Sequence, residues 1–123
     1  MQGLHLTADL LDCACSDALL SDLDALAAAC RADTVAAGLT LVSELFHRFP
    51  APPDGLAGIT GVLLLAESHL AVHTWPEVRG VTLDAYVCNY SADNSARAEA
   101  LVAALLARFE PRRVTRNRLM RGV

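Results

Sequence analysis

The sequence contains no lysine, since all ten of its basic residues are arginine. A protein that forms a Schiff base through its own lysine, such as the usual pyridoxal phosphate enzyme, is therefore excluded. The sequence also has no apolar run near the ~20 residues of a membrane span. Its first segment, MQGLHLTADLLDCACSD, has no cationic leader. These absences predict a cytoplasmic protein that has no membrane partner.

Positive charge is also scarce, because the 123 residues carry a formal net charge of −4. Nucleic acid is disfavoured as the main partner, since neutralising phosphates requires a clustered positive surface. The one basic cluster, RRVTRNRLMR near the C-terminus, is typical of the solvated face of an edge strand. The length and an apolar content of 54% predict a single domain, residues 1–123, with its own core.

Four cysteines and four histidines raise the question of a metal site. The C-A-C spacing is not that of a C-x2-C knuckle, and no H-x3-H pair falls on an expected helix, so we predict no metal. In a reducing compartment the cysteines are expected to remain thiols. The cysteines are Cys13, Cys15, Cys30 and Cys88, and the histidines are His5, His47, His69 and His73.

Apolar patterning predicts six strands and two helices. The expected strands span 3–11, 39–49, 58–66, 69–75, 81–88 and 113–120, and the one over 58–66 is apolar enough to be buried on both faces. The expected helices span 17–37, with Ser16 as N-cap and Gly38 as stop, and 93–109.

This order of elements predicts an α+β fold, a two-layer α/β sandwich. The sheet is expected to be largely antiparallel, with both helices on one face. Its other face must then be polar or covered, so we expect the chain to dimerise through that face or through an edge.

The segment LLLAESHLAVHTWPE, residues 63–77, places ionisable and hydrogen-bonding groups where a core strand ends. Ser68 could act as a hydrolase nucleophile with His69 or His73 as base and Asp84 as the orienting acid. No G-x-S-x-G elbow surrounds Ser68, however, and E-S-H leaves no glycine for a sharp turn. A serine hydrolase is therefore disfavoured.

A different reaction suits a serine that follows a strained carbonyl. The Ser68 hydroxyl can attack the carbonyl of Glu67 and convert the peptide bond to an ester. β-Elimination then breaks the chain and leaves a dehydroalanine that hydrolyses to a pyruvoyl group. Such a ketone condenses with the amine of a substrate and draws electrons from a breaking carbon–carboxylate bond. The protein would thus supply the carbonyl, and a missing lysine would be no obstacle.

Four parts of the sequence together carry a family resemblance: AESHLAVHTWPE (66–77), FHRF (46–49), GLHL (3–6) and Cys88 at the end of a strand. They resemble the small prokaryotic form of the S-adenosylmethionine decarboxylase proenzyme, over nearly the whole chain. The resemblance implies self-cleavage between Glu67 and Ser68. It gives a β chain, residues 1–67, and an α chain, residues 68–123, that begins with a covalent pyruvoyl group derived from Ser68. It also implies a homodimer of processed protomers.

The resemblance also assigns roles to individual residues. His73 would move protons during processing, and Cys88 would return a proton to the decarboxylated carbon. Thr60 stands where the family usually has a serine that assists processing, so we expect processing at a reduced rate. The product would be decarboxylated S-adenosylmethionine, the aminopropyl donor for spermidine.

Substrate recognition is assigned to four residues in or near the matching segments. The sulfonium and adenine of S-adenosylmethionine favour aromatic faces, which Phe49 and Trp75 offer. Glu77 could accept hydrogen bonds from ribose hydroxyls. His5, from the GLHL segment, completes the expected binding set.

Two alternatives remain, because the sequence departs from the family pattern at Leu4, at Asn89 and Tyr90, and in the proline-rich loop 50–58. Some members of the wider family are decarboxylases of L-arginine or L-ornithine. Those substrates would require a carboxylate facing the distal cation, and Glu44, Glu77 and Asp84 are candidates. The second alternative is a homologue that binds a ligand or partner but is never cleaved.

Overall fold

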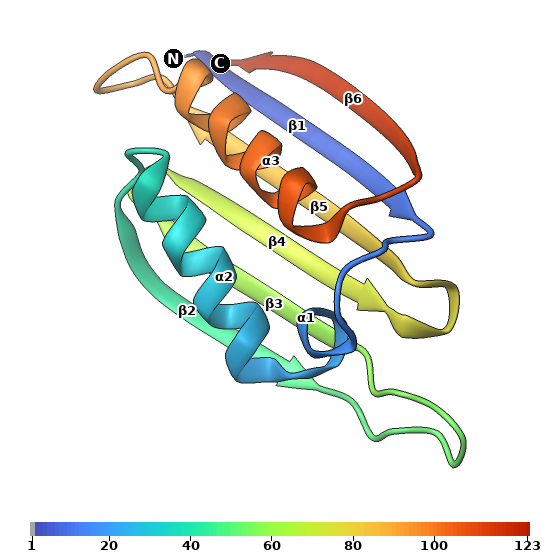
Figure 1. The fold of residues 1–123 in the computed structure, drawn as a ribbon. Helices are drawn as coiled ribbons and strands as arrows, with labels where there is room; N and C mark the ends of the chain where they lie inside the picture. Colours follow the sequence, from blue (N-terminus) through green and yellow to red (C-terminus); the bar gives the residue numbers. More distant parts are fainter. Residues whose placement is uncertain (1) are drawn as a thin grey trace.

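The computed structural model describes residues 2–123 and has a six-stranded sheet with its helices on one face (Figure 1). The strands are β1 (Gln2–Leu11), β2 (Leu41–Arg48), β3 (Ile59–Leu65), β4 (Ser68–Trp75), β5 (Gly80–Cys88) and β6 (Arg113–Gly122). The helices are α1 (Asp17–Ser21), α2 (Leu23–Ala36) and α3 (Ser95–Phe109), with a short 3-10 helix, η1, at Pro76–Val78.

The strands lie in the order β2-β3-β4-β5-β1-β6, and every neighbouring pair is antiparallel. This arrangement confirms the predicted α+β fold with a largely antiparallel sheet and its two long helices on one face.

The core lies between the sheet and the helices α2 and α3, which run side by side across it (Figure 1). Alternate residues of the central strands point at these helices, and burying each such leucine contributes about 2 kcal/mol. The fully buried side chains include Leu4, Leu10, Leu70, Val72 and Leu83 from the sheet and Leu26, Leu101, Leu105 and Phe109 from the helices. The intervening residues of each strand therefore face the opposite side of the sheet.

The expected single helix over 17–37 is wrong, since Asp22 divides it into α1 and α2. Asp22 has extended backbone angles (φ −98°, ψ 113°), and its carboxylate accepts a hydrogen bond from the Ala25 N–H at 3.1 Å. An aspartate competes well for such a capping position, and this local bond overrides the helical spacing around it. Gly38 does follow the end of α2, with φ 87°, as expected.

The prediction that the strand over 58–66 is buried on both faces is also wrong for the single chain. In β3, Ile59, Leu63 and Leu65 face the helices, but Leu64 is 51% exposed on the other side. The uncovered sheet face carries further exposed apolar side chains on other strands, namely Leu45, Trp75 and Leu119. These four side chains leave apolar surface exposed on the open face.

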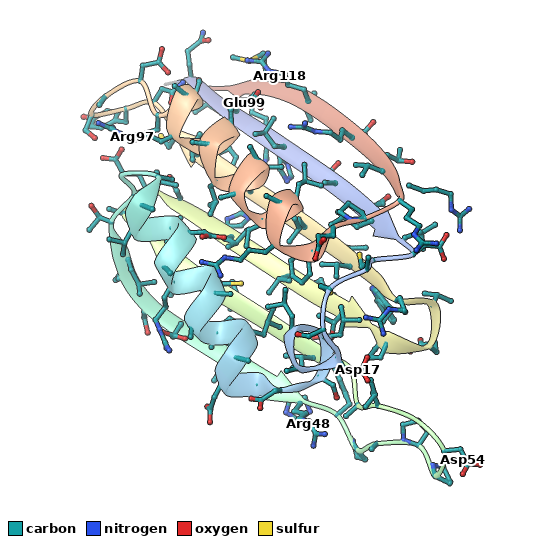
Figure 2. The ribbon with its side chains drawn as sticks, viewed as in Figure 1. Asp17, Arg48, Asp54, Arg97, Glu99 and Arg118 are labelled. Atoms are coloured by element: carbon teal, nitrogen blue, oxygen red, sulfur yellow. The ribbon has the colours of Figure 1, made fainter. Side chains whose placement is uncertain are left out.

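The C-terminal basic cluster forms β6, an edge strand that is exposed along its whole length, as predicted. Arg118 reaches back to Glu99 on α3, with a nitrogen–oxygen distance of 3.2 Å (Figure 2). Arg116 contacts the same carboxylate at 3.5 Å. Among residues 2–123, no helix is long and apolar enough to cross a membrane.

Candidate active site

The turn between β3 and β4 carries the proposed cleavage point. Ala66 and Glu67 form a two-residue connection, and Leu65 pairs with Ser68 across it. Glu67 has φ 63°, a left-handed conformation that costs a residue with a β-carbon roughly 1–2 kcal/mol. The structure therefore places backbone strain on the residue whose carbonyl forms the peptide bond to Ser68.

Cys88, at the end of β5, lies beside Ser68. The Cys88 N–H donates to the Ser68 hydroxyl oxygen at 3.4 Å, and both residues are half-buried. The structure thus brings together the hydroxyl and the thiol-bearing residue that the sequence assigned to one site.

His73 lies elsewhere, at the other end of β4. Its Nδ1 atom is 3.1 Å from the Thr60 hydroxyl, across the β3–β4 pair. An extended strand rises ~3.4 Å per residue, so about 17 Å separates the positions of Ser68 and His73 within one chain. The structure pairs His73 with Thr60, which the sequence did not predict, but it does not bring His73 to its own Ser68.

The three residues predicted to hold the substrate's aromatic and sugar parts gather at the His73 end. A cavity of about 250 Å³ is lined by Phe49, Trp75 and Glu77 together with Thr60 and His73. Both aromatic side chains are about half exposed, at 47% and 48%. Their faces are therefore accessible from this cavity.

His5 lies apart from that cavity, in a cluster toward the Ser68 end of the sheet. The Asp84 carboxylate contacts the Nε2 atom of His5 at 2.6 Å and that of His69 at 3.4 Å. The Tyr86 ring packs against both imidazoles. Sequence reasoning named Asp84 but missed this double contact, although Asp84, Tyr86 and Cys88 share one face by strand alternation.

These contacts differ from those of a hydrolase triad. Ser68 accepts the Cys88 N–H, His73 bonds to Thr60, and Asp84 is engaged with His5 and His69. Neighbouring residues on a strand point to opposite faces, which separates the side chains of Ser68 and His69. Of the other candidate carboxylates, Glu44 is paired with Arg31 at 2.8 Å.

The loop after β5 departs from the family pattern and has its own hydrogen bonds, which the sequence did not reveal. The Asn94 side-chain amide donates to the Cys88 carbonyl at 2.9 Å. The Asn89 side-chain oxygen accepts from the Asn94 N–H at 2.9 Å, and its amide contacts the Ser95 hydroxyl at 3.2 Å. These bonds fix the backbone at Cys88.

The remaining cysteines are remote from this chemistry. Cys13, Cys15 and Cys30 are buried thiols, and burial raises the pKa of Cys13 to about 11 and that of Cys30 to about 12. Within residues 2–123 no group of three or more metal-ligating side chains could hold an ion.

Comparisons with known proteins match nearly the whole chain to a single family. The family model described as S-adenosylmethionine decarboxylase matches residues 4–122. The S-adenosylmethionine decarboxylase proenzyme of Symbiobacterium thermophilum is 36% identical over 115 residues, covering 94% of this chain and 82% of that protein. The corresponding proenzyme of Thermomicrobium roseum is 33% identical over 121 residues, covering 98% of this chain and 94% of that protein.

A solved structure is similar in its fold as well. The crystal structure of the adenosylmethionine decarboxylase from Aquifex aeolicus superposes with a TM-score of 0.83 and 29% sequence identity. The match covers 98% of this chain and 91% of that one.

Proposed function

Because this chain belongs to the S-adenosylmethionine decarboxylase family, we propose that it cuts its own backbone between Glu67 and Ser68 and then decarboxylates S-adenosylmethionine. The chain is a proenzyme of this family, and its reaction is a step toward spermidine. The observation that carries the cleavage proposal is the left-handed Glu67 directly before Ser68, whose hydroxyl lies beside Cys88.

Cleavage begins when the Ser68 hydroxyl oxygen adds to the Glu67 carbonyl carbon. The carbon–nitrogen bond breaks, and an ester joins Glu67 to the Ser68 side chain while the nitrogen of residue 68 becomes a free amine. Loss of the Cα proton of residue 68 then expels Glu67 as a carboxylate. The dehydroalanine left behind takes up water and releases ammonia, and residue 68 becomes pyruvoyl.

The surroundings of Ser68 fit such a group. The Cys88 N–H already donates to the side-chain oxygen of residue 68, so a polar donor is available there. Scission also relieves the strained φ of Glu67. Once formed, the pyruvoyl ketone supplies the electron sink for decarboxylation. Cys88 would return the proton to the substrate carbon, and the bond from Asn94 holds the Cys88 backbone in place.

The chain is proposed to act as a homodimer of processed protomers, because one chain alone separates Ser68 from His73. A two-fold axis that runs parallel to the open sheet face and perpendicular to β4, near the middle of that strand, would stack the two sheets face to face. One β4 would then lie antiparallel to the other. The start of one strand would then meet the end of its partner. Ser68 and Cys88 of one protomer would face Thr60 and His73 of the partner subunit, completing two equivalent sites.

The open sheet face supports this arrangement. Leu45, Leu64 and Leu119 are more than half exposed on it, and a second copy would remove them from water. The cavity lined by Phe49, Trp75 and Glu77 would travel with His73 to the partner's cleavage end. There it would receive the adenine, sulfonium and ribose of the substrate, while His5 and Asp84 lie on the Ser68 side.

The decisive test is denaturing mass spectrometry of the purified protein. The wild type should give two fragments, residues 1–67 and 68–123, the second lacking a free amino terminus. Ser68→Ala should remain a single inactive chain. A wild type that stays intact after prolonged incubation would favour the uncleaved binding homologue.

The substrate needs a separate test, because Glu77 at the cavity could also face the distal cation of arginine or ornithine. Carbon dioxide release should be measured from S-adenosylmethionine, L-arginine and L-ornithine in parallel, and only the first should react well.

We propose the cytoplasm as the compartment, because its reducing conditions keep the Cys88 thiol from oxidation.

A further inference from the structure

A second cavity lies directly behind the cleavage turn, on the side of the helices. It has a volume of about 160 Å³ and is lined by Glu67, Thr40, Gly38, Ser91, Asn94 and Arg97. Among the described residues that line it, Arg97 is the one that carries positive charge. The lining of this cavity therefore includes Glu67, which cleavage turns into a chain end, and one cationic side chain, Arg97.

Arg97 is held in place by its neighbours from two other segments. Its Nη1 atom donates to the Asn94 side-chain oxygen at 2.7 Å. Its Nε atom lies against Gly38, where an added Cβ would come within 3.3 Å of it. Figure 2 shows Arg97 between the loop that joins β5 to α3 and the upper end of α2. The guanidinium is thus fixed beside the cavity by a glycine and an asparagine.

The other side of the cavity already holds a carboxylate. The side chain of Glu67 accepts a hydrogen bond from the Ser91 hydroxyl at 3.0 Å and a longer one from the Ser91 N–H at 3.4 Å. The cavity also adjoins the first turn of α3, where the helix dipole favours negative charge. Ser91 thus already holds the Glu67 side chain, and a second anion at residue 67 would find a cation and a helix start close by.

We propose that Arg97 binds the main-chain carboxylate that cleavage creates at Glu67, while Ser91 keeps hold of the Glu67 side chain. This inference rests on the proposed function, since the carboxylate forms only when elimination at residue 68 transfers the former Ser68 oxygen to Glu67. The new end then carries two negative charges, one on the main chain and one on the side chain. Pairing with Arg97 compensates the second charge and draws the end behind the turn, away from the group at residue 68.

This capture has a consequence for the substrate. The severed end of the β chain is covalently free of β4 and could otherwise remain over residue 68 and Cys88. Docked on Arg97, it leaves that space open to the substrate. The captured chain end and the substrate would therefore bind on different sides of the same turn.

The test uses carboxypeptidase Y, which needs an accessible main-chain carboxylate, on the processed protein. Trimming of Glu67 and Ala66 is followed by the mass of the β chain. The Arg97→Gln variant should be trimmed about tenfold faster than the wild type, since a charged hydrogen bond to the carboxylate is lost. Arg31→Gln is the matched control, because it removes an exposed arginine that is paired with Glu44, away from the cavity. It should be trimmed like the wild type.

Circular dichroism and complete cleavage establish that each variant is folded before trimming begins. If Arg97→Gln does not fold or mature, Ser91→Ala takes its place and should also be trimmed faster than the wild type. Equal trimming rates for the folded variant and the wild type would overturn this proposal alone. A wild type that never cleaves would overturn the proposed function and this proposal with it.

Discussion

His73 bonds to Thr60 at 3.1 Å and stands at the opposite end of β4 from Ser68. The residues that the family resemblance assigns to one site therefore lie at two separate places in a single chain. One contains Glu67, Ser68 and Cys88, and the other contains the Thr60–His73 pair with its aromatic cavity. A proton carried by His73 cannot reach Ser68 of the same chain, because about 17 Å of extended strand separates the two residues.

This division predicts that two defective chains can restore one another. Ser68→Ala lacks the residue that is cut, and His73→Ala lacks the imidazole. In a mixed dimer, one site combines the intact Ser68 of the second variant with the intact His73 of the first. Co-expression should therefore yield cleaved chains carrying His73→Ala, counted by mass spectrometry, where each variant alone stays whole.

The control for this restoration is co-expression of His73→Ala with a chain that carries both substitutions. That mixture keeps Ser68 in one chain but has no His73, and it should remain uncut. Failure of the first mixture to cleave, with heterodimers shown by differential tagging, would place His73 outside the processing site.

Thr60 is predicted to assist cleavage through its hydroxyl. Thr60→Ala removes the partner of the His73 Nδ1 atom and should slow cleavage by about 10- to 100-fold, which corresponds to a lost hydrogen bond of some 1.4–2.8 kcal/mol. Thr60→Ser keeps the hydroxyl without the β-branch and should cleave at least as fast as the wild type. Gel electrophoresis over time measures the rates.

Thr82 provides the control for this effect, because it pairs with His73 on the other side, in β5. Thr82→Ala should leave the cleavage rate within about twofold of the wild type, as surface substitutions usually do. A similar slowing in both alanine variants would mean that strand packing, and not the Thr60 hydroxyl, sets the rate.

The sequence predicted most of the fold because strand alternation and helical spacing are local patterns. The strands and the edge position of β6 both follow from such patterns. The break at Asp22 was missed because a single side-chain bond to Ala25 outweighed the regular apolar spacing on either side.

The division of the site was missed for a different reason. A motif places residues along the chain but says nothing of the ~3.4 Å that each residue adds along an extended strand. The contacts of Asp84 with His5 and His69 join three strands, and the bonds of Asn94 connect a loop to Cys88. Such contacts depend on sheet order and register, which one sequence leaves open.

Cys88 is predicted to serve decarboxylation more than cleavage. Cys88→Ala keeps the backbone N–H beside Ser68, so the chain should still be cut, while loss of a positioned acid should lower decarboxylation about 10²- to 10⁴-fold. Parallel assays of fragment formation and carbon dioxide release measure the two steps. Equal losses in both would assign Cys88 to cleavage instead.

Alkylation should distinguish Cys88 from the other cysteines. At pH 8, iodoacetamide should modify the half-buried Cys88 in the native protein, because burial keeps Cys13 and Cys30 covered and raises their thiol pKa values to about 11 and 12. All four cysteines should react after unfolding. Peptide mass mapping locates the labels, and early native labelling of Cys30 would contradict the buried core seen here.

Cys30 should also make the folded state less stable in alkali. Burial raises its thiol pKa to about 12 from the ordinary 9.0, with Asp33 adding to the shift. Between these values the unfolded chain loses the proton while the folded chain keeps it, so the free energy of unfolding falls as pH rises, by on the order of 1 kcal/mol per pH unit. The free energy of unfolding can be measured with urea from pH 8 to 11, in the uncut Ser68→Ala background and with reductant. It should decline less steeply with pH when Cys30→Ala is added. Parallel curves for the two proteins would show that burial does not raise the pKa of this thiol above its value in the unfolded chain.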